Sequence, residues 1–132
     1  MAASESPEEI ADAIVLGRRG YLQIQKTILA IRRIGDWQRD NGLPGQPGIA
    51  AMRQAFEDQV DALVPRIRNA EAGLAAMIPS AAAEDLLAKA EAAQPPAVPG
   101  EGEQVIEQLA GILTGPGSLE TKQALVTQAF GN

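Results

Sequence analysis

Apolar positions recur every three or four residues along the first part of the chain. This series, here called the seam, has Gly17 as its only small member and consists of Ile10, Ile14, Gly17, Tyr21, Ile24, Ile28 and Ile31. A repeat of about 3.5 residues places such positions along one side of a helix. The seam predicts a long helix that packs against other helices, in the manner of a coiled coil.

Local signals predict where this helix begins and ends. Ser6 and Glu9 form a Ser-x-x-Glu capping box, with Pro7 at the first helical position. Asn41-Gly42 is a typical stop. The pattern therefore predicts a helix over residues 7–41. Glycines disfavour helix interiors, so a bend or break is expected within 17–20.

A second apolar series predicts a partner helix that begins near Gly48. Its members are Ile49, Met52, Phe56, Val60, Leu63, Ile67, Ala70, Leu74 and Met77. The short connection Leu43–Gly48 favours an antiparallel helical hairpin. Pro65 lies inside the series and is expected to kink the helix, because its ring removes a donor and clashes one turn back.

Shorter elements follow the hairpin. Ser80 is the expected N-cap of a third helix that ends near Ala93, and Ser118 is the expected cap of the last helix. Two short C-terminal helices are predicted on either side of the turn Gly115–Gly117, the first with an apolar stripe formed by Val105, Ile106, Leu109, Ile112 and Leu113. The predicted fold class is all-α. The predicted domains are a helical hairpin or bundle (1–93), a Pro/Gly linker (94–102) and a helical pair (103–132), which could pack on its own chain or on a neighbour.

Composition narrows the chemistry. The 132 residues include no cysteine and no histidine, which excludes disulfides, Cys/His zinc sites and catalysis by histidine. The net charge of −6 disfavours non-specific binding to nucleic acid. The acidic N-terminal segment is unlike a signal peptide, so we expect a soluble protein made in the cytoplasm. No cofactor, metal or catalytic site is predicted.

A basic stripe is predicted on the side of the first helix away from the seam. Arg19, Lys26 and Arg33 recur every seven residues there. The stripe could bind phosphates or an acidic partner surface. Alternatively it could be a solvated face, paired with acids of the second helix (Glu57, Asp58 and Asp61), and charge runs usually have that role.

Two glycine motifs and one carboxylate pair have simpler interpretations. Gly17-Arg-Arg-Gly20 matches the GxxG of KH-type RNA-binding loops in letters, but no strands flank it. Residues 111–118 lack the lysine of a phosphate loop. Glu57 and Asp61 share a helix face without a facing pair, which indicates a solvated acidic surface.

Four further side chains are candidates for partner binding. Val15, Leu22 and Leu29 lie beside the seam and are expected to leave apolar surface for a partner. Trp37 is the only tryptophan. It is expected either to pack in the core near the hairpin turn or to anchor an interface, where tryptophan is enriched.

Three functional hypotheses remain from the sequence. The first is a non-enzymatic structural or adaptor subunit of a larger assembly, homo- or hetero-oligomeric, with a tail-, portal- or capsid-associated bacteriophage virion component as its favoured instance. The second is a soluble secretion or assembly chaperone that binds a client protein. The third is a helical nucleic-acid-binding protein that uses the basic stripe. No membrane span is expected.

Overall fold

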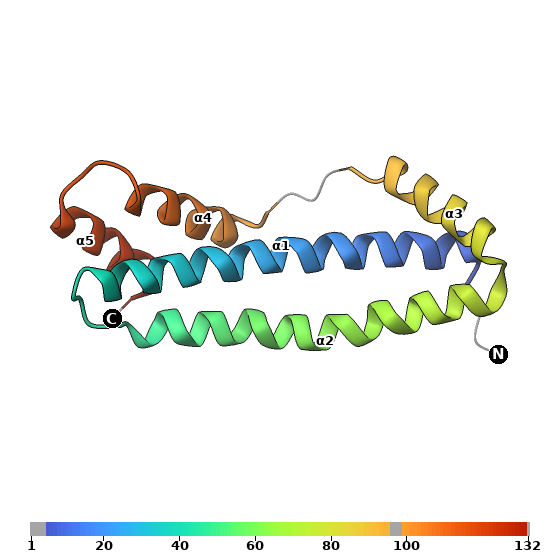
Figure 1. Ribbon diagram of the computed structural model, residues 1–132, viewed down its shortest axis with the longest axis horizontal. Helices are drawn as coiled ribbons and strands as arrows, with labels where there is room; N and C mark the ends of the chain where they lie inside the picture. The colour runs from blue at the N-terminus through green and yellow to red at the C-terminus, as the bar shows by residue number, and fades with distance from the viewer. Residues whose placement is uncertain (1–4, 96–98, 132) are drawn as a thin grey trace. The chain divides into compact units, whose positions relative to one another are not determined.

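The computed structural model describes residues 5–95 and 99–131, and these residues form five α-helices and no strand (Figure 1). The all-α prediction is confirmed. The helices, in chain order, are α1 (Pro7–Asp40), α2 (Pro47–Met77), α3 (Ser80–Ala93), α4 (Glu101–Leu113) and α5 (Leu119–Phe130).

The predicted ends of α1 are confirmed. The hydroxyl of Ser6 accepts a hydrogen bond from the backbone N–H of Glu9 at 3.2 Å. Gly42 follows the helix with φ of 70°, a conformation that glycine adopts without steric cost. The break expected within residues 17–20 is wrong, because α1 continues through this region as one helix of 34 residues. α2 also continues through Pro65.

Two predicted boundaries shift slightly. Ser80 is the first helical residue of α3 instead of its cap, and Pro79 precedes the helix without a side-chain cap. α4 begins at Glu101, inside the predicted linker. Residues 96–98 of that linker lie outside the described residues. Ser118 caps α5 as expected, because its hydroxyl accepts from the N–H of Thr121 at 3.2 Å.

The chain divides into two compact units that each contain part of α1 and part of α2. The described part of unit 1 is 5–22 and 60–95, and that of unit 2 is 23–59 and 99–131. Unit 1 therefore contains α3, whereas unit 2 contains α4 and α5. All seam positions are buried or half-buried in their own unit.

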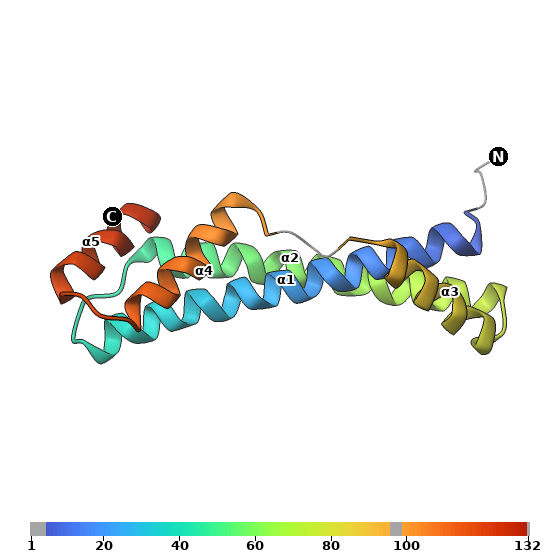
Figure 2. The ribbon, with the colours of Figure 1, turned by 90° about the horizontal axis from the view of Figure 1, so that it is seen from above.

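The core of unit 1 is made by α1, α2 and α3. Its buried members are Ala11, Ile14, Val15, Leu74 and Ala90. Gly17 on the seam allows close packing here, since a Cβ built on it would lie 2.9 Å from Cγ1 of Ile67. Figure 2 shows α2 and α3 joined by a short connection within this unit.

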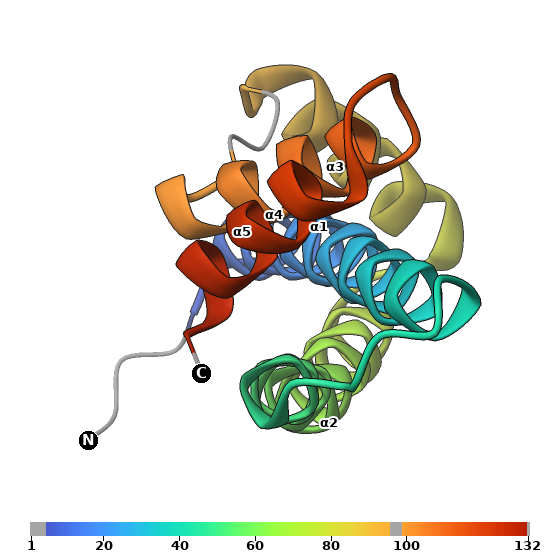
Figure 3. The same ribbon diagram turned by 90° about the vertical axis from the view of Figure 1, so that its left-hand side faces the viewer.

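The core of unit 2 joins the end of α1 and the start of α2, which are connected by the loop of residues 41–46, to the C-terminal helices α4 and α5. In Figure 3 the unit 2 part of α1 lies between α2 and the α4–α5 pair. The buried residues come from all four helices and are Ala30, Ile31, Ile34, Ile49, Ile106, Leu109, Ala110, Leu113 and Val126. The two C-terminal helices therefore pack on their own chain.

Candidate functional site

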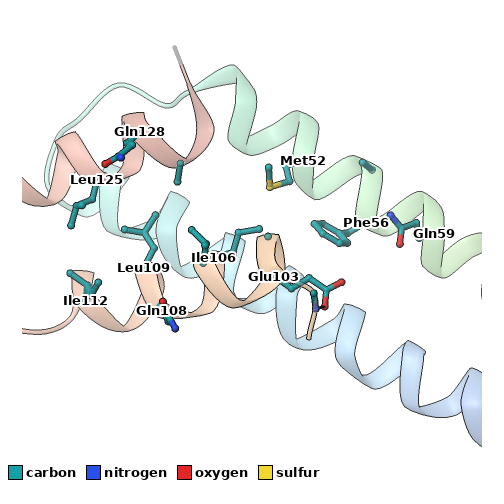
Figure 4. A pocket seen from close by; sticks show the side chains of 15 residues that line it. Met52, Phe56, Gln59, Glu103, Ile106, Gln108, Leu109, Ile112, Leu125 and Gln128 are labelled. Carbon is teal, nitrogen blue, oxygen red and sulfur yellow. Dashed lines mark hydrogen bonds between the residues drawn. The ribbon is translucent and has the colours of Figure 1, made fainter. Parts of the chain in front are cut away.

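An apolar groove of about 880 Å³ opens on unit 2 between α2, α4 and α5 (Figure 4). The α2 wall includes Met52 and Phe56, and the α5 wall includes Leu125 and Ala129. Ile106 and Leu109 of α4 also line the groove and belong to the buried core. We call this the α2–α4–α5 groove.

The α4 side of the groove carries exposed apolar side chains. The buried face of α4 presents residues such as Leu109 and Leu113 to the core. Val105 and Ile112 lie outside that face, where 52% and 47% of their respective surfaces remain exposed. Both residues line the groove. Large exposed apolar side chains grouped beside a hollow are typical of interaction surfaces.

The polar residues lining the groove are almost all uncharged. Three are glutamines: Gln59, Gln108 and Gln128. Glu103 is the one charged residue among those that line it, and its carboxylate accepts from the N–H of Gly100 at 3.4 Å. In a chain of net charge −6, this groove is a nearly neutral surface.

A network of glutamines ties α5 to the loop end of the hairpin. Gln38 is buried, and its Nε2 donates to Oε1 of Gln46 at 3.1 Å and to Oε1 of Gln123 at 3.2 Å. Gln46 Nε2 donates in turn to the carbonyl of Gly131 at 2.6 Å. The bonds from Gln38 to Gln123 and from Gln46 to Gly131 link α5 and the residue that follows it to the end of α1 and to the α1–α2 connection. The amide group of Gln38 thereby finds acceptors for its Nε2, as buried amides require.

Close backbone packing fixes the end of α5. Gly48, near the start of α2, lies directly beside the carbonyl group of Phe130. A Cβ at position 48 would overlap that carbonyl oxygen. The absence of a side chain at Gly48 thus lets the last turn of α5 lie against α2.

The structure separates the members of the predicted basic stripe. Arg19 belongs to unit 1, where its side chain is only 17% exposed and forms an ion pair with Glu91 at 2.8 Å. It also donates to the backbone carbonyls of Glu91 and Pro95. Arg19 therefore fastens α1 to the end of α3 and presents little surface to a partner.

Lys26 and Arg33 are exposed in unit 2. They line a shallow hollow with Leu29 of α1 and Glu107 of α4. Neither forms an ion pair within the described parts of the chain. The predicted pairing with acids of α2 occurs instead at a neighbouring position, where Arg32 lies 3.9 Å from Glu57.

The remaining candidates differ in exposure. Leu22 and Leu29 are exposed, as expected for partner-facing positions. Val15 is 1% exposed and packs in the core of unit 1, which corrects the expectation that it leaves surface for a partner. Trp37 is half-buried against the core of unit 2, consistent with packing near the hairpin turn.

Residues 5–95 and 99–131 contain no group of three or more carboxylates placed to hold a metal ion. No helix among them is long and apolar enough to cross a membrane. Comparison of the chain with protein-family models, with curated proteins and with solved structures found no match.

The α2–α4–α5 groove was not predicted from the sequence. Its lining residues come from three segments, 52–59, 100–112 and 125–129, that are far apart along the chain. One signal was present in α4, where Val105 and Ile112 widen the apolar stripe beyond the face that a single core requires. An amphipathic helix with apolar residues on a second face has surface for a second partner.

Proposed function

We propose that this protein is a non-enzymatic structural or adaptor subunit of a larger protein assembly, and that it binds another protein chain through the α2–α4–α5 groove. The observation that carries the proposal is the groove itself, whose lining includes the exposed Val105 and Ile112 together with Met52 and Phe56. An apolar hollow between helices suits the apolar face of a partner helix.

The exposed apolar surface of the groove is large enough to contribute measurably to the free energy of binding a partner. Full burial of one large aliphatic side chain stabilises by about 1.5–3 kcal/mol. Val105 and Ile112 are half-exposed, so covering both would contribute roughly 2–3 kcal/mol, which corresponds to about a hundredfold in affinity.

The favoured instance is a bacteriophage virion component associated with tail, portal or capsid. Its support is general: a small, acidic, alanine-rich chain without cysteine or histidine that contains a Pro/Gly-rich joint. A secretion or assembly chaperone is the second candidate, since the same groove could hold a client protein transiently. The nucleic-acid candidate has lost support, because Arg19 is engaged within its own unit.

The size of the native complex tests the proposal. The tagged full-length chain would be purified from its own cells or particles and its complexes measured by light scattering after gel filtration. An assembly subunit elutes in a species of fixed stoichiometry larger than the 13.8 kDa chain. A chain that elutes only as a monomer contradicts the proposal. A complex that dissociates once the client protein has matured supports the chaperone candidate instead.

A further inference from the structure

We infer that the partner in the α2–α4–α5 groove is a second copy of this chain, and that the two copies pair through antiparallel α4 helices about a twofold axis. The inference rests on the proposed function, which makes the groove a protein-binding surface. It identifies α4 both as a wall of the groove and as the element that enters the groove of the other copy.

The spacing of apolar residues on α4 suits such pairing. Val105 and Ile112 are seven residues apart, on the same side of the helix, and Gln108 lies between them. An antiparallel pair centred between Gln108 and Leu109 brings Val105 of each copy opposite Ile112 of the other. The contact is therefore self-complementary, as a twofold interface requires.

The dimensions agree with this arrangement. The α4 residues that line the groove run from Gly102 to Ile112, which is about 15 Å along a helix axis. That length accommodates roughly three helical turns, and α4 has 13 residues. In the register stated above, the α4 of the other copy would extend from about residue 104 to beyond Ile112 of this helix, and so would cover most of the lined stretch.

The charges near the groove are compatible with a second copy. Two chains of net charge −6 repel each other, so they can meet only where charges are few, distant or offset. The two Glu103 side chains would be about 16 Å apart along the axis, which exceeds the Debye length of about 8 Å at physiological salt. Glu107 is nearer the centre, but it shares its hollow with Lys26 and Arg33 of its own chain.

A basic amphipathic helix is the alternative partner, and the groove offers it few opposite charges to bind. Its lysines or arginines would find only Glu103 among the residues that line the groove. The glutamines that line the groove are uncharged, so the groove suits an occupant whose facing surface is also uncharged. The face of α4 that carries Val105, Gln108 and Ile112 has that composition.

Sedimentation equilibrium tests the pairing directly. The wild-type full-length chain is expected to show a concentration-dependent mass of up to twice 13.8 kDa. Ile112→Asp should weaken association at least tenfold, whereas the control Leu16→Asp, at an exposed leucine of unit 1, should not. Circular dichroism checks that both variants stay helical. A wild-type monomer at all concentrations, or an Ile112→Asp dimer of unchanged affinity, overturns the inference.

Engineered cysteines test the antiparallel register, because the chain has none of its own. Gln108→Cys should form disulfide-linked homodimers. A mixture of Val105→Cys and Ile112→Cys chains should cross-link more than either alone. Equal cross-linking by Leu16→Cys, or preferential Val105→Cys homodimers, contradicts the register. A wild-type monomer that still occurs in a native complex of fixed stoichiometry refutes self-pairing alone, whereas a monomer in both experiments refutes the proposed function as well.

Discussion

Gly17 of α1 lies against Ile67 of α2 so closely that no side chain fits between them. A Cβ at position 17 would be 2.9 Å from Cγ1 and 3.4 Å from Cδ1 of Ile67. The glycine disfavours the helix locally by about 1 kcal/mol relative to alanine. Its retention in the middle of the seam is explained by this contact between the two helices of unit 1.

Gly17→Leu is therefore expected to destabilise the protein by about 1–3 kcal/mol, because the larger side chain must displace Ile67 or separate the helices. Urea unfolding measures the change. The matched control is Gly35→Ala in the same helix, where a Cβ meets nothing within 4 Å. That substitution should stabilise by roughly 0.5–1 kcal/mol. Equal effects of the two changes would show that helix propensity alone decides.

Arg19→Met should loosen the end of α3. The substitution removes the ion pair with Glu91 and the hydrogen bonds to two backbone carbonyls at the end of that helix. We expect a loss of about 1 kcal/mol, since the arginine is mostly buried but Glu91 is exposed. Amide hydrogen exchange should increase in the last turn of α3.

Arg18→Met is the control for that experiment. Arg18 pairs with Glu71 at 2.9 Å, but both side chains are more than 40% exposed. Pairs of this kind contribute about 0–1 kcal/mol. If Arg18→Met costs as much stability as Arg19→Met, the buried position of Arg19 has no special role.

Gly48→Val is expected to displace the last turn of α5, because a side chain there would overlap the carbonyl of Phe130. Hydrogen exchange should rise in residues 127–131, with a local loss of about 1–3 kcal/mol. The α5 wall of the groove would loosen with it. Gly45→Ala, in open space three residues earlier, should leave this exchange unchanged. Unchanged exchange in Gly48→Val would mean that α5 does not depend on this contact.

Features that depend on neighbours along the chain could be predicted from the sequence. Ser6, Gly42 and Ser118 mark helix ends through interactions within one turn, and the structure has them in those roles. The expected break at Gly17–Gly20 failed because packing of α1 outweighs the local preference of glycine. Tertiary contacts sustain a helix that propensity alone disfavours.

Features that depend on distant segments could not be predicted. Arg19 was expected on a stripe that either binds a partner or is solvated, yet it pairs with Glu91, which is 72 residues away. Val15 was expected at the surface because periodicity identifies one buried face, whereas α1 is covered on more than one side in unit 1. The groove forms only because α4 and α5 pack against the hairpin residues of unit 2. The composition of the linker does not predict whether these helices pack on their own chain or on a neighbour.

Photo-cross-linking tests directly whether the α2–α4–α5 groove binds another protein chain. A photoreactive phenylalanine analogue would replace Gln108, which lines the groove and is exposed, or Leu16 of unit 1 as the control. On illumination in the protein's own cells or particles, the chain labelled at position 108 should form one defined adduct with a protein chain, and the chain labelled at position 16 should not. Absence of an adduct at position 108, or an equal yield from position 16, would contradict a protein-binding role for the groove.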